Sequence, residues 1–439
     1  MKTFEFRTLG CKVNQYESQA LRERLFDSGL RESEGNLTDI YVVNTCAVTQ
    51  KADKESFELI RQLNRRNPQA KIFVTGCSAQ NNPGILKNLR GVACVLENDE
   101  KENLPDFILS GDEKPRFSLE RPRITKFHQH TRAFLKIQDG CNNACSYCII
   151  PKLRGASRSR LLSEIAAEAR SLADNGYKEI VLCGICLGAY GKDLGPAEGL
   201  VKVIEALEKI DGLERIRLSS IEASDVSQEL INKMRNSEKL CRHLHIPFQS
   251  GEDKLLKLMK RKTTSDDYRK LVLGLRKVFA DIGITTDIMA GFPGEDEISF
   301  KQTIKFLKEV RPSRIHVFPF SPRQHTPAFG FGNRVNPQAV KARARQIKAL
   351  AKELYFDFCR SNLGKTLNIL LESSPEAKTG LYKGYSDNYL KVFLPRPSFN
   401  RNIPLEEGRG LPKAEHLTNT IVKVQAIKIY QDGILAALP

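Results

Sequence analysis

Cys141-Asn142-Asn143-Ala144-Cys145-Ser146-Tyr147-Cys148 places three cysteines in one short loop, at Cx3Cx2C spacing. A cubane iron–sulfur cluster takes four thiolates, so the loop predicts a cluster with one iron left open. An open iron can bind a small molecule and pass it an electron. A zinc site is the alternative, but zinc sites favour CxxC pairs with a second pair or histidines downstream. Here the nearest histidines, His128 and His130, lie upstream.

Composition places the chain among globular proteins of a reducing compartment. Its 439 residues suggest two to four domains, and 41% of them are hydrophobic, which is enough for sizeable cores. No segment reaches the apolar length of a membrane span, and residues 1–7 lack the apolar run of a signal peptide. We therefore expect a cytoplasmic protein with no membrane partner, whose 11 cysteines are ligands or buried thiols rather than disulfides.

Positive charge is concentrated around the cysteine loop. The net charge is +17 and the pI is about 9.3. Nine basic residues and one acidic residue stand between Arg121 and Arg160. This distribution favours a nucleic-acid substrate over a merely soluble surface. Arg154, Arg158 and Arg160 are the predicted phosphate-binding residues.

The first hundred residues alternate strand and helix patterns. Strands are predicted at residues 3–9, 39–44 and 71–75, and helices at 17–28, 51–64 and 83–89. This alternation predicts a parallel sheet with covering helices. The sheet domain is expected to occupy residues 1–110, and a charged linker residues 111–131.

The alternation resumes in residues 132–362. Six strands are predicted, at residues 133–138, 179–183, 215–219, 243–247, 285–289 and 314–318, with helices between them. Six such units form a partial (βα)6, TIM-like barrel. Its active site is expected at the carboxyl ends of the strands, and the three-cysteine loop follows the first strand.

Residues 363–439 have a different, β-rich pattern with turn signals. Their length suits a small OB-like β-barrel, a frequent scaffold for single-stranded nucleic acid. Lys383, Tyr385 and Tyr389 are the predicted RNA contacts here, because aromatic rings stack on bases and lysines meet phosphates.

A second set of cysteines occupies equivalent places in the first domain. Cys11, Cys46 and Cys77 each come just after a predicted parallel strand. The carboxyl ends of parallel strands meet at one edge of the sheet, so the three thiols are expected to converge, again one short of four. The alternative is three buried, inert thiols.

The remaining cysteines are interpreted as structural. Cys183 and Cys186 form a CxxC without a second pair, at the end of a predicted barrel strand. Cys94, Cys241 and Cys359 are expected to be core thiols.

Over essentially its whole length the chain resembles the radical S-adenosylmethionine (SAM) methylthiotransferases. The matching stretches are TLGCKVNQYES (8–18), NTCAVT (44–49), VTGC (74–77), the Cx3Cx2C loop, RLSSIE (217–222), HIPFQSG (245–251) and GFPGE (291–295). These stretches are most similar to those of the branch of the family that acts on N6-threonylcarbamoyladenosine beside the tRNA anticodon. Cys186 departs from that branch, which leaves its role open.

The resemblance implies two [4Fe-4S] clusters, SAM and a C-terminal TRAM domain. The implied cluster ligands are Cys141, Cys145 and Cys148 for the SAM-binding cluster and Cys11, Cys46 and Cys77 for the second. The implied or candidate SAM contacts are Gly184, Ser219, Gln249, Gly291, Pro293 and Gly294. The implied reaction inserts sulfur at C2 of the modified adenine and methylates it, with electrons from a donor such as flavodoxin or ferredoxin. The alternatives are isopentenyladenosine in tRNA or a ribosomal-protein side chain as substrate, and an RNA-binding protein with structural clusters only.

Overall fold

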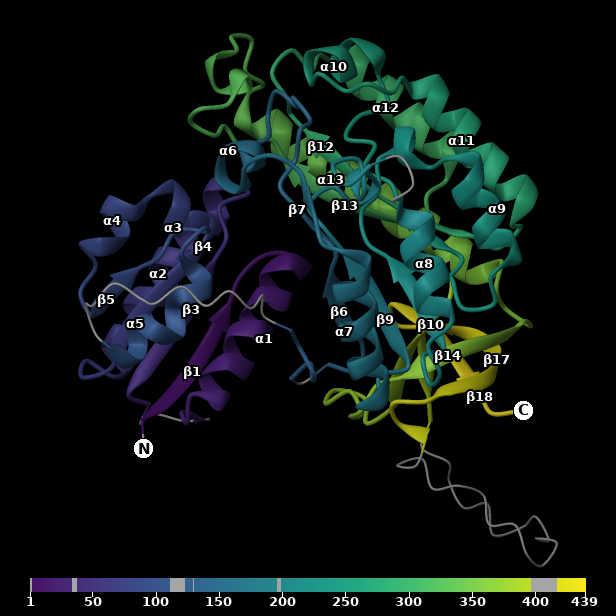
Figure 1. Cartoon of the computed structure of the whole chain (residues 1–439). Coiled ribbons are helices and arrows are strands. Elements are labelled where there is room, and N and C mark those ends of the chain that lie inside the picture. The colour runs from purple at the N-terminus through teal and green to yellow at the C-terminus, as the bar shows by residue number, and fades with distance from the viewer. Residues whose placement is uncertain (1, 34–37, 111–122, 129, 196–198, 396–416) are drawn as a thin grey trace, which may run out of the picture.

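The computed structural model describes residues 2–33, 38–110, 123–128, 130–195, 199–395 and 417–439. Within them an N-terminal α/β sheet, a larger strand-and-helix barrel and a small closed β-barrel follow one another along the chain (Figure 1). This confirms the predicted fold class. None of the helices in these ranges combines the length and apolarity needed to cross a membrane.

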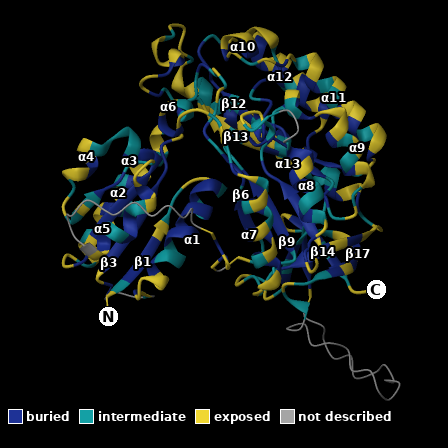
Figure 2. Cartoon of the chain, viewed as in Figure 1, coloured by how far each residue is buried: buried dark blue, intermediate teal, exposed yellow. Residues whose placement is uncertain are grey.

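The N-terminal sheet has five parallel strands. They are β1 (Thr3–Thr8), β2 (Arg31–Glu32), β3 (Ile40–Thr45), β4 (Lys71–Gly76) and β5 (Val92–Val95), in the order β2-β1-β3-β4-β5. Helices α1 (Lys12–Asp27) and α5 (Leu104–Ser110) cover one face, and α2 (Gln50–Arg66), α3 (Cys77–Asn81) and α4 (Pro83–Lys87) accompany the other. Because both faces are covered, β3 is a continuous buried run, as Figure 2 shows.

The second domain contains the six predicted parallel strands. They are β6 (Ala133–Lys136), β9 (Glu179–Cys183), β10 (Arg215–Leu218), β11 (His243–His245), β12 (Gly283–Ala290) and β13 (Arg314–Pro319). They pair as β10-β9-β6 and β11-β12-β13, and isolated bridges such as Ser220–His245 join the two groups. The outer helices are α7 (Leu162–Asp174), α8 (Leu200–Glu208), α9 (Gln228–Asn236), α10 (Asp253–Leu258), α11 (Ser265–Val278), α12 (Glu297–Val310) and α13 (Pro337–Arg360). Their apolar faces share one core with the strands.

Helix α1 belongs to both domains. Leu21 and Leu25 pack under the N-terminal sheet, whereas Val13, Tyr16 and Ala20 lie in the core of the barrel. In Figure 1 the helix lies between the N-terminal strands and β6, with which it makes contact. The sheet that carries one cysteine set is therefore packed directly against the barrel that carries the other.

The segment predicted as a linker is only partly described. Residues 111–122 lie outside the described residues. Ile124 and Phe127 are buried in the barrel core, so the last part of the segment is packed. The domain limits at 110, 131 and 362 stay predictions.

The C-terminal domain is a closed five-stranded barrel. Its strands β14 (Thr366–Leu371), β15 (Tyr382–Ser386), β16 (Lys391–Leu394), β17 (Ile421–Tyr430) and β18 (Gly433–Ala437) close in the order β14-β15-β16-β18-β17. Arg215 and Arg217 of β10 dock this barrel, because they donate to the main-chain carbonyls of residues 368 and 385–387 at 2.5–3.0 Å.

Candidate functional site

The Cx3Cx2C loop is anchored at both ends and in its middle. The loop and the short helix α6 (Ile150–Arg154) follow one another between the two paired strands β7 (Gln138–Asp139) and β8 (Arg158–Ser159). Ser146 is fully buried, and its hydroxyl donates to the Leu258 carbonyl at 2.7 Å. Gly140 has φ +69°, and a Cβ there would lie 2.0 Å from the Ala156 carbonyl oxygen. Only glycine lets the loop leave the hairpin this way.

Cys186 lies against the first cysteine of this loop. A hydrogen bond from the Cys186 thiol lowers the pKa of Cys141 to about 6, against the opposing effect of burial, and the Asn143 amide assists. Asn143 Nδ2 also approaches the Cys186 sulfur, at 3.7 Å. Cys183 fits the structural interpretation, since it is buried in the barrel core. Cys186 is buried too, but it acts directly on a predicted cluster ligand.

This contact makes a testable prediction for the reduced, cluster-free protein. Replacing Cys186 with alanine removes the donor, so the Cys141 pKa is expected to rise from about 6 towards its ordinary range. Thiolate forms above the pKa and is the reactive species. The pH midpoint for alkylation of Cys141, followed by peptide mass spectrometry, should therefore move up by about one unit or more. Cys183→Ala is the matched control, and an unmoved midpoint in Cys186→Ala would contradict the assignment.

A buried ion pair stands beside the second cysteine of the loop. Arg261 Nη1 lies 3.8 Å from the Cys145 sulfur and donates to Glu222 Oε1 at 2.9 Å. Its Nη2 donates to the Pro247 carbonyl at 2.9 Å. Glu222 is therefore a partner of Arg261. The two residues stand 39 positions apart, and no sequence pattern links them.

Cys11, Cys46 and Cys77 meet at the carboxyl edge of the N-terminal sheet. They follow β1, β3 and β4, which are neighbours in the sheet. Gly10, with φ +99°, brings the Cys11 turn so close to Cys46 that a Cβ on it would lie 2.9 Å from the Cys46 Cβ. Burial raises the pKa of Cys46 to about 11, and the charges of Cys77 and Cys11 add to the rise. The three thiols are thus close enough for the charge of one to affect the pKa of another.

Arg154 connects the two cysteine sets. It ends α6, shortly after Cys148, and is only 3% exposed. Its guanidinium donates to Asn14 Oδ1 at 2.6 Å, to Glu17 Oε1 at 2.9 Å and to Asp139 Oδ1 at 3.0 Å. Burial raises the pKa of the Cys77 thiol, and the charge of Arg154 and a hydrogen bond from it oppose that rise.

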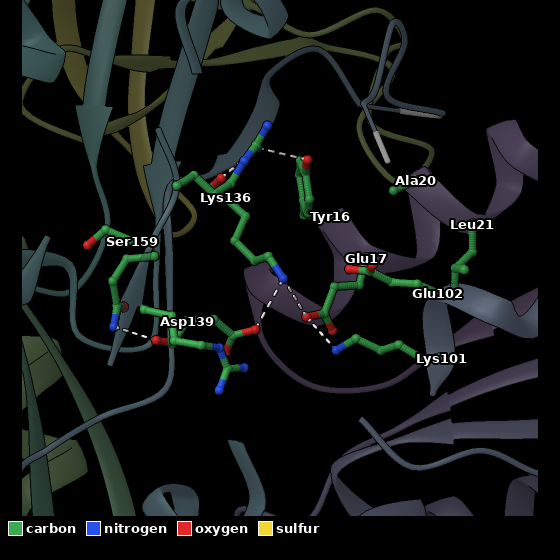
Figure 3. Close-up of a pocket in the computed structure, with 12 residues that line it drawn as sticks. Tyr16, Glu17, Ala20, Leu21, Lys101, Glu102, Lys136, Asp139 and Ser159 are labelled. Atoms are coloured by element: carbon green, nitrogen blue, oxygen red, sulfur yellow. Dashed lines mark hydrogen bonds and ion pairs between the residues drawn. The ribbon is translucent and has the colours of Figure 1, made fainter. Parts of the chain in front are cut away.

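A cavity with charged residues in its lining lies between the domains, beside Glu17 and Asp139, two partners of Arg154. A cavity of about 230 Å³ is lined by Tyr16 and Glu17 of α1, by Lys101, and by Lys136, Asp139 and Arg160 of the barrel side. Figure 3 shows Glu17 between the ammonium groups of Lys136 and Lys101, which lie 3.0 and 2.7 Å from its Oε1. Burial alone would raise the pKa of Glu17, but Arg154, Lys101 and Lys136 hold it well below its usual range.

Two of the three predicted phosphate-binding arginines are therefore wrongly assigned. Arg154 is buried among carboxylates, and Arg160 is 8% exposed and donates to Glu168 at 2.6 Å. A guanidinium held in a buried ion pair is not available to a phosphate. Arg158 alone is exposed; its Nη1 donates to the Arg154 carbonyl at 3.1 Å.

The predicted SAM contacts lie at the carboxyl ends of the barrel strands. Gly184 follows β9, Ser219 follows β10, and Gly291, Pro293 and Gly294 follow β12. Gln249, with φ +66°, bridges to Ile288 of β12. The Ser219 hydroxyl is buried and has no hydrogen-bond partner among the described residues, as expected of a group that meets a ligand.

Packing within the protein explains one of these glycines. A Cβ on Gly291, which has φ +79°, would lie 2.3 Å from a Val340 methyl group of α13. The turn therefore needs glycine whether or not a cofactor is near. The remaining assignments to SAM stay predictions.

The predicted RNA contacts of the C-terminal barrel lie at its junction with the second domain. The Tyr385 and Tyr389 rings stack at 5.2 Å, Arg132 lies over both rings, and Arg217 lies over Tyr389 at 4.7 Å. Lys383 lies 3.4 Å from Glu372. Rings sandwiched between arginines stabilise the junction. The assignment of Tyr385 and Tyr389 to base stacking stays a prediction.

Two family models match the chain. The Radical SAM superfamily model matches residues 135–307, and the model of the uncharacterized protein family UPF0004 matches residues 3–97. The first match contains the Cx3Cx2C loop, and the second contains Cys11, Cys46 and Cys77. A [4Fe-4S] cluster and SAM are accordingly the cofactors of this chain.

Curated relatives match almost the whole chain. The threonylcarbamoyladenosine tRNA methylthiotransferase MtaB of Bacillus subtilis is 38% identical over 407 residues, covering 89% of this chain and 90% of the relative. MtaB of Thermotoga maritima is 39% identical, covering 89% and 91%. The tRNA-2-methylthio-N(6)-dimethylallyladenosine synthase of Acetivibrio thermocellus is 32% identical, covering 93% and 86%.

A solved structure shares the fold at lower identity. The radical S-adenosylmethionine methyltransferase TsrM from Kitasatospora setae, with cobalamin and a [4Fe-4S] cluster bound, superposes with a TM-score of 0.56 at 16% identity. The match covers 75% of this chain and 77% of that one. The two cysteine sets, the family models and the curated relatives agree: the chain belongs to the radical-SAM methylthiotransferase family.

Proposed function

We propose that this chain transfers a methylthio group to C2 of N6-threonylcarbamoyladenosine, beside the anticodon in tRNA. The observation that carries the proposal is the pair of three-cysteine sets on the two sides of α6, joined by Arg154. Sulfur insertion needs one site that makes a radical and another that supplies sulfur. The relatives named for threonylcarbamoyladenosine at 38% and 39% identity favour that base over the dimethylallyl one, at 32%.

The proposed cluster ligands are Cys141, Cys145 and Cys148 on one side and Cys11, Cys46 and Cys77 on the other. Each donor set offers three thiols to a cubane cluster. Cys141, Cys145 and Cys148 share one loop, whereas the other three cysteines follow the neighbouring parallel strands β1, β3 and β4. Cys186 is not among the proposed ligands; its hydrogen bond with Cys141 raises its own pKa and lowers that of Cys141. When bound, the SAM cluster supplies a radical able to remove hydrogen from an unreactive carbon.

In the proposed reaction, the residues of the protein hold the reacting groups in position. Ser146 clamps the loop onto the end of α10, and Arg261 donates toward the Cys145 sulfur. The buried Ser219 hydroxyl is free to bind SAM at the end of β10. The first turns of α1, which begins after Cys11, pack on the barrel through Val13 and Tyr16. The target base would then lie between the two cysteine sets.

The proposed RNA contacts follow from exposure. Arg158 and Lys152 are exposed basic residues beside α6, and Arg123 and Lys126 are exposed near α1. They could meet the phosphates of an anticodon stem-loop, and the net charge of +17 supports a polyanionic partner. We also propose that the enzyme works in the cytoplasm and takes electrons from a flavodoxin or ferredoxin.

Nucleoside analysis tests the substrate. In a strain lacking this chain, 2-methylthio-N6-threonylcarbamoyladenosine should disappear from digested total tRNA while its unthiolated precursor accumulates. Mass spectrometry detects both nucleosides, and the chain supplied in trans should restore the product. An unchanged product level would overturn the tRNA proposal and favour a ribosomal-protein side chain. Loss of the isopentenyladenosine derivative instead would identify the other tRNA base.

A second measurement separates an enzyme from an RNA-binding protein with structural clusters. Purified protein with both clusters loaded, given SAM and a strong reductant, should release 5′-deoxyadenosine. No release from fully loaded protein would favour the binding protein.

A further inference from the structure

Two histidines and an aspartate meet on the inner face of the second domain. His245 ends β11, Asp287 lies in β12 and His316 in β13, and the pairing of these strands sets Asp287 opposite His316. The alternate residues Leu244, Ile288 and Ile315 pack in the core beneath the outer helices. Because side chains alternate along a strand, the three polar residues share the face turned away from those helices.

The distances from Asp287 to the two histidines fit ligands around one ion. His245 Nε2 lies 3.3 Å from Asp287 Oδ2 and His316 Nδ1 lies 3.3 Å from Asp287 Oδ1, and one atom from each residue falls within 4.8 Å of the others. A direct N–H···O bond usually spans about 2.7–3.2 Å. Two ligands on one metal, with bonds of about 2.0–2.2 Å, are about 3.0–3.4 Å apart.

The imidazole of His245 is fixed through its second ring nitrogen, the one that does not approach Asp287. Its Nδ1 is hydrogen-bonded to the Thr285 hydroxyl at 2.9 Å, and the same hydroxyl bonds His243 Nε2 at 3.0 Å. This arrangement leaves Nε2 directed at Asp287. Histidine ligands of metals are typically fixed in this manner, with the second ring nitrogen bound to an outer partner.

The negative charge of the Asp287 carboxylate also favours the binding of a cation. In the described part of the chain no lysine or arginine forms an ion pair with this carboxylate, whose partners are two imidazoles that carry charge only when protonated. His316 is 49% exposed, whereas Asp287 is 24% and His245 15% exposed, so the group is open on the His316 side. An ion there would keep coordination positions free for water or for an oxygen ligand.

We propose that His245, Asp287 and His316 bind one divalent transition-metal ion, at a site separate from both cysteine sets. The donor set of two imidazoles and one carboxylate suits zinc, manganese, iron or cobalt and not magnesium or calcium, which prefer oxygen ligands. The site does not depend on the proposed tRNA reaction. An ion with open positions on this face could hold an oxygen-bearing group of the substrate base.

Metal counting in protein with both clusters loaded tests the site. Anaerobic dialysis against Zn²⁺, Mn²⁺ or Co²⁺ alone, followed by elemental analysis, should give one added equivalent of at least one of these ions, with iron and sulfide unchanged. Asp287→Asn and His316→Gln should weaken binding about tenfold or more, and Thr285→Val about 10- to 100-fold.

His128→Gln is the matched control, because His128 is exposed and lies outside the group. Asp287→Asn keeps the shape of the side chain, and circular dichroism checks that each variant is folded. No added equivalent of any of the three ions would overturn the proposal. Equal binding by wild type and Asp287→Asn would overturn it as well. Neither result depends on tRNA modification, so failure here is distinct from failure of the proposed function.

Discussion

Cys141→Ala is expected to lose about half of the iron and sulfide of the wild-type protein and all SAM-dependent activity. The loop that carries Cys141 is clamped by Ser146, so its other cysteines stay in place and only one ligand is lost. Three thiolates are already one fewer than a cubane takes, and two do not hold it. The second set, on the N-terminal sheet, should keep its cluster.

Cys11→Ala is expected to give the complementary result. It should lose the other half of the iron, retain the cluster at the Cx3Cx2C loop, and still release 5′-deoxyadenosine from SAM while forming no methylthiolated product. Iron, acid-labile sulfide and the two products are measured on the same preparations. Cys94→Ala, which alters a cysteine outside both sets, is the control. Complete loss of iron in both variants would contradict two independent sites.

Arg154→Leu is expected to be the most destabilising single change at the domain junction. Leucine would remove the donor to Asn14, Glu17 and Asp139 together and leave two carboxylates buried with fewer partners. Breaking a buried ion pair from one side costs about 3–5 kcal/mol. Hydrogen exchange should show faster exchange of the α1 amides, and chemical denaturation should show a lower midpoint. Iron analysis should show less iron bound at Cys11, Cys46 and Cys77.

Two variants make this experiment specific to Arg154. Arg158→Ala changes an exposed neighbour and should shift stability by less than about 0.5 kcal/mol. Arg154→Lys keeps the charge but not the planar fork that reaches several acceptors, so it should restore stability only in part. Full stability in Arg154→Leu would show that the network contributes nothing.

The acid sensitivity of the protein provides a second readout for the same residue. Because Arg154, Lys101 and Lys136 hold the Glu17 pKa well below its usual range, Glu17 adds stability above the unfolded-state pKa of about 4.3. That contribution is lost as the pH falls through the lower folded-state pKa. The loss on acidification should be smaller in Arg154→Leu, where the pKa of Glu17 is depressed less.

The sequence predicted the architecture because its patterns are local. Buried parallel strands form continuous apolar runs, and the cysteines follow those strands at one edge, so both three-cysteine sets could be located.

The sequence could not distinguish an exposed arginine from a buried one. Arg154 and Arg160 are buried by partners from α1 and α7, of which Glu17 is 137 positions away. The sequence around Tyr389 could not show its arginine neighbours either, because they come from β10 and from the start of the barrel. His245, Asp287 and His316 stand on three separate strands, and only the register of those strands brings them together.

The docking of the C-terminal barrel has a consequence for how this part of the chain can change. Arg215 and Arg217 bind it through main-chain carbonyls, which every amino acid provides. These bonds therefore depend on the path of the backbone, whereas the contacts of Arg132 and Arg217 with Tyr385 and Tyr389 depend on the two rings. The outward-facing residues of this barrel are free to drift or to be exchanged for those of another such barrel.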